Sequence, residues 1–299
     1  MRFDWYQATI TDDPSSGLRE LAKLGHEVKP DDVFGRRWRG AQGFSVIHRD
    51  KGVVAQLAMG GTTYGSDKFH ALATSENTDD FVSLVRDCWP DRHKVARADS
   101  AEDFFGEGST KKMLPVMKRI AKRHRLKYTR QQDMIDKTAG LTQYMGAPSS
   151  DSRVRGYEKG WEQVGKLDAM FPGQLPKEGL KIVNTQTGEL IDPAHWFRLE
   201  YQLRPRTDEG KELLARLSPV EVWGCTTWTR ELALEAMALD LEAFVMRTRK
   251  YSAFDERVAW MCRQYVHVFD QLVKELGEVE AMRHILKVIA QQKANKVIP

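Results

Sequence analysis

Alternation of charged and apolar residues in a few short segments is the feature that most restricts the fold. Successive side chains of a β-strand point to opposite faces, so residues two apart share a side. The segment WFRLEYQLR places Phe197, Leu199 and Tyr201 on one face. Its other face carries Arg198 and Glu200. The pattern predicts a strand with one face in a core and one polar face, as is common in antiparallel sheets.

Two further segments show the same alternation. If the three strands belong to one sheet, their polar faces form a single surface that combines carboxylates, a tyrosine and cations. The alternative is three separate amphipathic strands facing water, whose arginine–carboxylate pairs would each be worth ~0–1 kcal/mol. The polar face of VARADSAEDF carries Arg97, Asp99 and Asp103, and that of SRVRGYEK carries Arg153, Arg155, Tyr157 and Lys159.

The remaining periodicity predicts an α+β protein with an antiparallel-rich sheet and flanking helices. FSVIHRD, VVAQLAM and FHALATS are typical of short strands, and a helix is expected over 79–88. From Thr229 to Gln292 apolar residues recur with a period of 3.6, which predicts helices. We therefore expect a sheet-based domain over 1–225 and an all-helical C-terminal region over 226–299. No internal repeat is visible in the sequence.

Composition excludes several classes of protein. The 299 residues are 41% hydrophobic and 29% charged, which is typical of a globular chain. No apolar run approaches the ~20 residues of a membrane span, and the N-terminus does not resemble a signal peptide, so we expect a cytoplasmic protein. The three cysteines are too few and too widely spaced for a disulfide framework, and no histidines are spaced for metal binding.

A basic segment points to a polyanionic partner. The net charge is only +4, but KKMLPVMKRIAKRHRLKYTR, over 111–130, concentrates cations almost without acids. We expect an amphipathic helix whose Lys118, Lys122 and Arg125 contact DNA phosphates. A solvated helix face is the alternative for this segment.

The polar surface has the residue types that phosphodiester cleavage requires. Such cleavage needs a nucleophile, an aligned phosphate and neutralisation of its charge. The carboxylates of Asp99, Asp103 and Glu200 are hard ligands suited to Mg²⁺ or Mn²⁺. Tyrosine, with an ordinary pKa of ~10, becomes a nucleophile when nearby cations lower its pKa. Arg155 and Lys159 would do so for Tyr157.

The motifs VARADSAEDF, TQYMGAPSSDSRVRGYEKG and WFRLEYQLRP, in this order, resemble the replication initiation factor family. Its members are rolling-circle replication initiators of plasmids and filamentous phages, with related nickases, and the resemblance runs from about Asp4 to Trp223. It implies a sheet-based nicking domain, a divalent metal and a covalent 5′-phosphotyrosine intermediate at a replication origin. Asp99 and Glu200 match the acidic positions of the family, and Asp103 is a third candidate.

Two tyrosines compete for the role of nucleophile. Tyr157 shares its strand face with Arg155 and Lys159 and is slightly preferred, whereas Tyr144 lies beside a tight turn. Relatives usually follow the glycine of this turn with serine and arginine, but here Gly146 is followed by Ala147-Pro148. The basic contact at the turn is thus missing, and Arg153 or Arg155 would have to replace it. The expected DNA contacts on the sheet are Arg97, Arg153 and Arg198.

Three alternatives remain open from the sequence. A nickase for conjugation or mobilisation would use the same chemistry, a metal nuclease would use water instead of tyrosine, and a non-catalytic DNA-binding regulator would use only the scaffold. The partners that the resemblance implies are origin DNA, unpaired at the nick site, and a host helicase with the replication machinery. A homodimer is also compatible with it.

Overall fold

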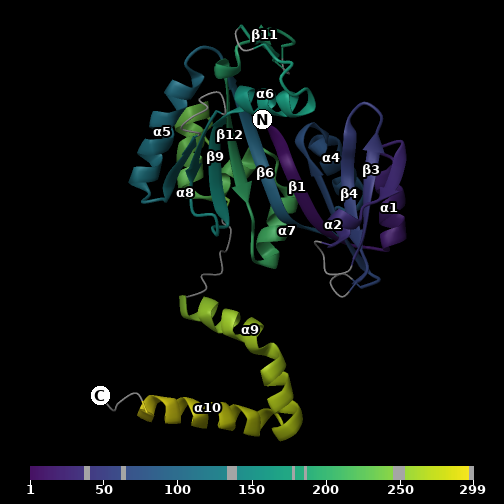
Figure 1. Ribbon diagram of the computed structural model, residues 1–299, viewed down its shortest axis with the longest axis vertical. Helices are drawn as coiled ribbons and strands as arrows, with labels where there is room; N and C mark the ends of the chain where they lie inside the picture. Colours follow the sequence, from purple (N-terminus) through teal and green to yellow (C-terminus); the bar gives the residue numbers. More distant parts are fainter. Residues whose placement is uncertain are drawn as a thin grey trace. The chain divides into compact units, whose positions relative to one another are not determined.

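The computed structural model divides the chain into two compact units, Met1–Thr248 and Arg249–Pro299. Figure 1 shows the elements of each unit, which are considered separately. The structure describes residues 1–36, 41–61, 65–132, 140–176, 179–184, 187–244 and 253–295.

A ten-stranded sheet forms the centre of the first unit. Its order is β2-β3-β4-β5-β1-β6-β12-β9-β8-β7, and every neighbouring pair is antiparallel. A separate pair, β10 and β11, lies outside this sheet. The strands are β1 Arg2–Thr11, β2 Glu27–Pro30, β3 Gln42–His48, β4 Gly52–Met59, β5 Lys68–Thr74, β6 His93–Phe105, β7 Tyr128–Gln132, β8 Leu141–Met145, β9 Ser152–Glu158, β10 Ile182–Val183, β11 Leu190–Ile191 and β12 Trp196–Leu203.

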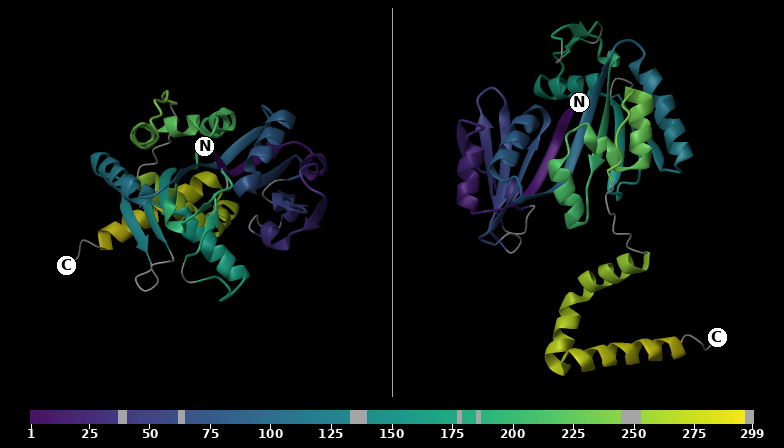
Figure 2. Two further views of the ribbon diagram at one scale, coloured as in Figure 1. Left: turned by 90° about the horizontal axis from the view of Figure 1, so that it is seen from above. Right: turned by 180° about the vertical axis from the view of Figure 1, so that it is seen from behind.

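One face of the sheet is buried under five helices, which we call the core face (Figures 1 and 2). The main hydrophobic core joins side chains of these helices to strand residues such as Tyr6, Val95, Val154 and Leu199. Burial of this apolar surface is the main force that holds the sheet against its helices. The five helices are α1 Pro14–Ala22, α4 Thr78–Cys88, α5 Ser109–Arg123, α7 Asp208–Arg216 and α8 Thr227–Met237.

The opposite face of the sheet, which we call the open face, is covered only in part. The short helix α2 (Asp32–Arg36) contributes Phe34 to a small apolar cluster with Leu72 and Trp5. The helix α6 (Lys159–Met170) packs against β12 and against the 3₁₀ turn η3 (Pro193–His195). The other 3₁₀ turns are η1 Ser75–Asn77 and η4 Glu221–Cys225.

The two halves of the sheet repeat one order of elements. The first half runs β1, α1, β2, β3, β4, β5, α4, and the second runs β6, α5, β7, β8, β9, β12, α7. In the sheet, β1 and β6 are central neighbours, and the others follow outward as β5, β4, β3, β2 on one side and β12, β9, β8, β7 on the other. The helices α2 and α6 are insertions into this shared plan.

Local sequence signals explain where several helices begin. Asp13 caps α1 by accepting a hydrogen bond from the Ser16 amide, and proline occupies the first turn. Thr207 and Thr226 cap α7 and α8 in the same manner. These side chains satisfy backbone N–H groups that have no partner within the helix.

The α+β fold, the predicted strands and the helix at 79–88 are confirmed. The basic helix is shorter than predicted: α5 ends at Arg123, Arg125 has φ +52, and residues 128–132 form β7. The strand SRVRGYEK also ends one residue before its expected end, because Lys159 begins α6.

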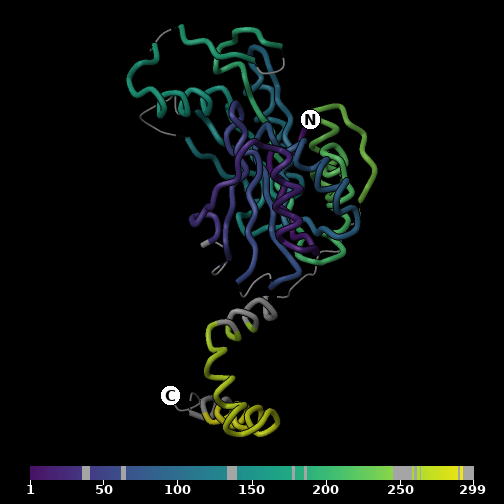
Figure 3. Tube along the Cα trace, turned by 90° about the vertical axis from the view of Figure 1, so that its right-hand side faces the viewer, coloured from purple at the N-terminus to yellow at the C-terminus, as the bar shows by residue number. Residues whose placement is uncertain are grey.

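The second unit consists of two helices, α9 (Ala253–Leu276) and α10 (Glu278–Asn295), joined at Gly277 (Figure 3). Gly277 has φ +77, a conformation that glycine adopts without strain. The division of the chain falls after Thr248 instead of after residue 225, because α8 packs against α5 within the first unit. No helix in the part of the chain that the structure describes is long and apolar enough to cross a membrane.

Candidate functional site

The register of the open face brings the three predicted polar strands together. Arg198 on β12 lies opposite Asp103 on β6 and Tyr157 on β9. Glu200 lies opposite Arg155 on β9, which in turn faces Tyr144 on β8. The predicted single polar surface is therefore present, and it is formed by four adjacent strands, β6, β12, β9 and β8.

Arg198 and two aspartates form a buried ionic cluster. The Arg198 guanidinium donates to Asp103 through Nε (2.7 Å) and Nη2 (2.6 Å), and to Asp4 through Nη1 (2.8 Å). Trp196 Nε1 donates to the same Asp103 carboxylate at 2.8 Å. Arg198 is 1% exposed, so it holds Asp103 in place and offers no charge to DNA, contrary to the expectation from sequence.

Asp99 also forms an ion pair with an arginine, Arg97. Arg97 Nε donates to Asp99 Oδ1 at 2.9 Å, and its Nη2 reaches Oδ2. Gln202 Nε2 donates to Oδ2 at 3.4 Å. The guanidinium of Arg97 also stacks 4.1 Å from the ring centroid of Trp5. In this structure the Arg97 guanidinium therefore lies between the Asp99 carboxylate and the Trp5 ring.

Glu200 lies at the centre of the polar surface. Arg155 Nη2 donates to Glu200 Oε2 at 2.6 Å, and the Tyr157 hydroxyl donates to the same oxygen at 3.3 Å. Burial raises the pKa of Glu200; Arg155 opposes this change, while the negative charges of Asp99 and Asp4 add to it. The charges of Glu200 and Asp99 thus disfavour each other, and a cation bound to both would relieve that repulsion.

Tyr157 is buried, and its hydroxyl donates a hydrogen bond to Glu200. Its side chain is 4% exposed. Burial, and then the charge of Glu200, raise the pKa of Tyr157 well above its ordinary value. The sequence predicted the opposite direction, and that prediction was wrong because it counted the nearby cations without the cost of burial.

Lys159 does not supply the charge expected of it. As the first residue of α6, it forms an ion pair with Glu162 one turn later, and its Nζ lies 5.7 Å from the Tyr157 ring centroid. Burial and the neighbouring Arg198 lower the pKa of Lys159. The lysine charge is therefore directed mainly at Glu162.

Tyr144 occupies an accessible position on the same surface. It is half-buried and lines a cavity of about 160 Å³. The guanidinium of Arg153 lies 3.9 Å from its ring centroid. We call this cavity the tyrosine cavity; it is lined by Arg97, Tyr144, Arg153, Arg155, Glu200 and Gln202.

The turn after Tyr144 has a basic side chain from elsewhere in the chain. Gly146 has φ +93, and a Cβ there would lie 2.8 Å from the Ser152 carbonyl oxygen. Arg206 donates to the Ser149 carbonyl at 2.7 Å and pairs with Asp151 at 2.5 Å. An arginine that follows β12 thus lies at the turn where the sequence lacks one.

The three predicted metal ligands do not form one site. Within the described residues, no three His, Cys, Asp or Glu side chains gather as metal ligands would. The Asp103 carboxylate already accepts hydrogen bonds from Arg198 and Trp196. Asp99 and Glu200 lie near each other on the open face, and their oxygens suit a hard cation. Because Mg²⁺ is commonly held by one or two carboxylates, with water and substrate phosphate completing its shell, these two residues fit such an ion.

The cations of α5 lie on the other side of the sheet. Met117 and Ile120 of α5 belong to the core, so the helix covers the core face. Arg119, Arg123 and His124 pair with Glu231 and Glu235 of α8. Lys118, Lys122 and Arg125 are exposed. Any DNA they bind approaches the face opposite the tyrosines.

Sequence reasoning missed Asp4 and Gln202 as members of the site. Asp4 lies beside a bulge in β1, between Phe3 and Trp5, where the register of the strand shifts. The alternation of Arg2 and Asp4 at the N-terminus was a usable signal for a further polar strand. Gln202 shares the face of Glu200, but an amide carries no charge that draws attention to it.

Comparisons with known proteins give a distant likeness to solved structures. No family model matches the sequence, and no curated protein matches it. A solved structure similar to this chain is the rolling circle replication initiator protein from Geobacillus stearothermophilus, with 20% identity and a TM-score of 0.47. The likeness covers 74% of this chain and 82% of that chain. The residues of the site are therefore interpreted from their own geometry.

Proposed function

We propose that this protein starts rolling-circle replication by nicking one DNA strand at an origin through attack of a tyrosine. The observation that carries the proposal is the tyrosine cavity. In it an accessible phenol, Tyr144, lies among the guanidinium groups of Arg97, Arg153 and Arg155, next to the Glu200 carboxylate. The motifs that resemble replication initiators lie on the strands that form this cavity.

Tyr144 is the better nucleophile of the two tyrosines. A phosphodiester must come within reach of the attacking oxygen, and Tyr144 lines an open cavity whereas Tyr157 is 4% exposed. The raised pKa of Tyr157 also disfavours its phenolate. The role we assign to Tyr157 is to position Glu200, to which it donates a hydrogen bond.

The arginines of the cavity would bind and neutralise the scissile phosphate. Arg153 and Arg155 flank Tyr144, one over its ring and one opposite it in the sheet. A guanidinium group matches phosphate oxygens with two parallel hydrogen bonds and keeps its charge at any relevant pH. Such donors stabilise the charge that develops on phosphorus during attack.

Asp99 and Glu200 are the residues that would hold Mg²⁺ or Mn²⁺. When bound, the ion would act as a Lewis acid on the phosphate. The repulsion between Glu200 and Asp99 supports this position, because a cation bound to both carboxylates would relieve it. Binding would require Arg97 and Arg155 to turn away from these two carboxylates and toward the phosphate.

The proposed reaction exchanges one phosphodiester for another. The Tyr144 oxygen forms a bond to phosphorus, the bond from phosphorus to the 3′ oxygen breaks, and the DNA keeps a free 3′ hydroxyl. The phenol loses a proton and the 3′ oxygen gains one. Because the energy of the broken bond is kept in the phosphotyrosine, the reverse reaction can rejoin the strand without ATP.

Origin binding would involve other parts of the chain. We assign sequence-independent contacts with duplex DNA to Lys118, Lys122 and Arg125, since lysines and arginines bind phosphates without reading bases. The proposed division of labour is nicking by residues 1–225, with a supporting role for 226–299. A host helicase would extend the nick, and a homodimer remains a proposal.

The test is formation of a covalent adduct. The protein is incubated with Mn²⁺ and labelled single strands that tile the DNA around its gene, and the products are separated on a denaturing gel. We expect labelled DNA to migrate with the protein, and chelation of the metal to abolish this band. Tyr144→Phe should remove the band, Tyr157→Phe should weaken it, and Tyr128→Phe, a half-buried tyrosine on β7, should leave it unchanged.

Other outcomes separate the alternatives. An adduct absent in Tyr157→Phe but kept in Tyr144→Phe would reverse the two roles and leave the function standing. Metal-dependent cleavage without any adduct would indicate a nuclease that uses water. Binding without cleavage would indicate a regulator.

A further inference from the structure

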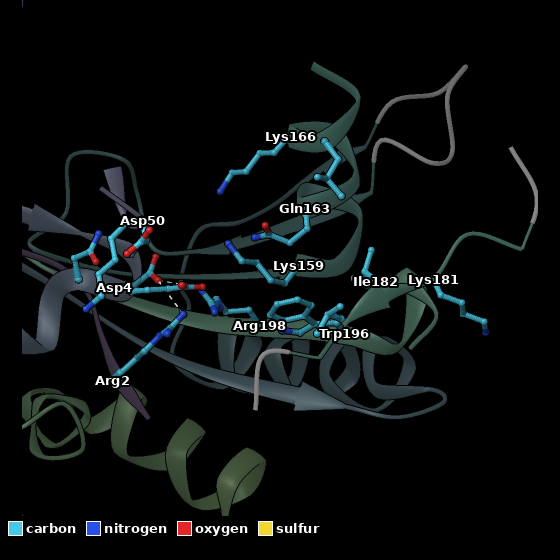
Figure 4. A pocket seen from close by; sticks show the side chains of 16 residues that line it. Arg2, Asp4, Asp50, Lys159, Gln163, Lys166, Lys181, Ile182, Trp196 and Arg198 are labelled. Atoms are coloured by element: carbon cyan, nitrogen blue, oxygen red, sulfur yellow. Dashed lines mark hydrogen bonds and ion pairs between the residues drawn. The ribbon is translucent and has the colours of Figure 1, made fainter. Parts of the chain in front are cut away.

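A second, larger cavity lies on the same face of the sheet. Its volume is about 580 Å³, which is within the range of ligand sites, about 300–1,000 Å³. Figure 4 shows its floor, formed by Trp196 and Arg198 of β12, and a wall formed by Lys159, Gln163 and Lys166 of α6. These three α6 residues are spaced to share one helix face. We call it the lysine cavity.

The lining is cationic and comes from both halves of the sheet. Arg2 of β1, Lys51 of the β3–β4 turn, Lys166 and Lys181 add to Lys159 and Arg198, whereas the acids of the lining are Asp4, Asp50 and Glu76. Asp103 and Asp4 already neutralise Arg198, and Asp80 pairs with Lys51. Arg2 lies 4.0 Å from Asp4, which Arg198 already binds at 2.8 Å, so the cations that keep most of their charge for a ligand are Arg2, Lys166 and Lys181.

Two of these cations can bind a further partner. The Nε of Arg2 is buried and has no hydrogen-bond partner in the part of the chain that the structure describes. Lys166 pairs with Glu162 Oε1 at 3.3 Å and Lys159 pairs with Oε2, so two positive charges share one carboxylate. An anion in the cavity would relieve this excess of positive charge.

The cavity also has an apolar end. Leu167 on α6, Ile182 and Val183 on β10 line it together with the indole of Trp196. Cations beside an apolar wall suit a ligand that is charged at one end and flat and weakly polar at the other. A nucleotide, with a phosphate and a base, has this character.

One strand connects the two cavities. Gln202 and Glu200 of β12 line the tyrosine cavity. Arg198 and Trp196, the next two residues on the same face of β12, line the lysine cavity. Side chains two apart on a strand share a face, and the rise from Glu200 to Trp196 is about 13 Å. A DNA strand lying along β12 would reach both cavities.

We propose that the lysine cavity binds a nucleotide of the nicked single strand, a short distance along the chain from the phosphate in the tyrosine cavity. This inference rests on the proposed function. Arg2, Lys166 and Lys181 would bind the phosphate, and the wall of Leu167 and Ile182 would hold the sugar and base. The site gives the strand a fixed path across the open face before it is cut.

The experiment measures binding of a fluorescein-labelled oligothymidylate by anisotropy over a range of salt, without metal, in a Tyr144→Phe background. The slope of log affinity against log salt falls by about 0.7 for each phosphate of a single strand that the protein no longer neutralises. Because both lysines are assigned to one phosphate, Lys166→Ala with Lys181→Ala should reduce the slope by about 0.7. Both lysines are exposed, so the fold should not depend on them. The matched control, Lys29→Ala with Lys68→Ala, removes the same charge from exposed positions of the first half and should leave the slope unchanged.

An unchanged slope in the cavity variant, or an equal reduction in the control, would overturn the proposal. Displacement of the oligonucleotide by thymidine 5′-monophosphate at a similar concentration would also overturn it, because the cavity would then take free nucleotides. If the cavity variant binds normally while the unmodified protein still forms its adduct, the cavity assignment fails and nicking stands. If the cavity binds as expected but no adduct forms, the proposed function fails and the binding site stands.

Discussion

The two halves of the sheet share one plan of strands and helices but use their open faces differently. In the first half, Trp5, Leu72 and Ala58 pack against Phe34 of α2 in a small apolar cluster. In the second half, the corresponding face carries Asp99 and Glu200 with their arginines. Both halves share one continuous core on the opposite face. Burial of apolar side chains on the core face therefore stabilises both halves. The residues of the open face can differ in chemistry without loss of this core.

Polar residues in the first half are satisfied by one another. Asp31 accepts from Ser45 at 2.7 Å and from Gln56 at 2.9 Å, and its other oxygen caps the Phe34 amide at 2.8 Å. This network fixes α2 on the sheet. The second half instead carries the tyrosine cavity and supplies most of the cations of the lysine cavity, so these charges lie next to open space.

The largest effect is expected from the ionic cluster of the second half. Arg198→Met keeps the length of the side chain but leaves Asp103 and Asp4 without their cation. Breaking a buried ion pair in this way costs about 3–5 kcal/mol of the free energy of unfolding. Urea denaturation would measure it. Adding Asp103→Asn to Arg198→Met should recover part of the loss; if it does not, the cluster is not held by charge.

The apolar cluster of the first half should give a smaller effect and no loss of chemistry. Leu72→Ala removes a side chain that is 3% exposed and should cost near the lower end of the ~2–5 kcal/mol found for buried leucines, since the cluster is small. Leu57→Ala, in the main core, is the control and should cost more. Adduct yield per folded molecule should equal that of the unmodified protein. A specific loss of adduct in Leu72→Ala would mean that the first half takes part in the reaction.

Acid should weaken the first half through His70. Burial lowers the pKa of His70 to about 4, against about 6.5 in an unfolded chain. Between these values the unfolded chain binds a proton that the folded chain does not, so stability present above pH 6.5 is lost as pH falls. The free energy of unfolding should drop by about 2 kcal/mol from pH 7 to pH 5. His70→Asn should remove most of this drop, and an equal drop in the variant would assign it to other groups, of which His93 is one.

The smallest effect is expected where α5 meets α8. Arg119 pairs with Glu235 at the surface, with the arginine 52% exposed. Arg119→Ala should change the free energy of unfolding by less than about 1 kcal/mol, and high salt should reduce the difference. Chemical denaturation in low and high salt would measure both. A cost of several kcal/mol would show that the pairs between α5 and α8 lock the second half together.

The sequence predicted those structural features that depend on residues close together in the chain. The faces of β6, β9 and β12 follow from alternation, and the helix over most of the basic segment follows from its amphipathic pattern. The pairing of strands was not predictable in detail, because it depends on contacts between segments far apart. The strand register places Arg198 opposite Asp103. The resulting ion pair occupies the carboxylate that was expected to bind a metal. The burial of Tyr157 likewise depends on how β12 and α6 pack beside it, which alternation does not encode.

The repeated plan also has a consequence for aggregation. An open sheet has two edges whose unpaired N–H and C=O groups can pair with another chain. Because β1 and β6 join the halves at the centre, the edges of the ten-stranded sheet are, within the described residues, β2 and β7. Edge β2 is four residues long, carries Glu27 and Lys29 and ends in Pro30, and β7 carries the exposed Arg130. Short edges bearing charge and proline resist edge-to-edge pairing, so this ten-stranded sheet is protected against polymerising through its edges.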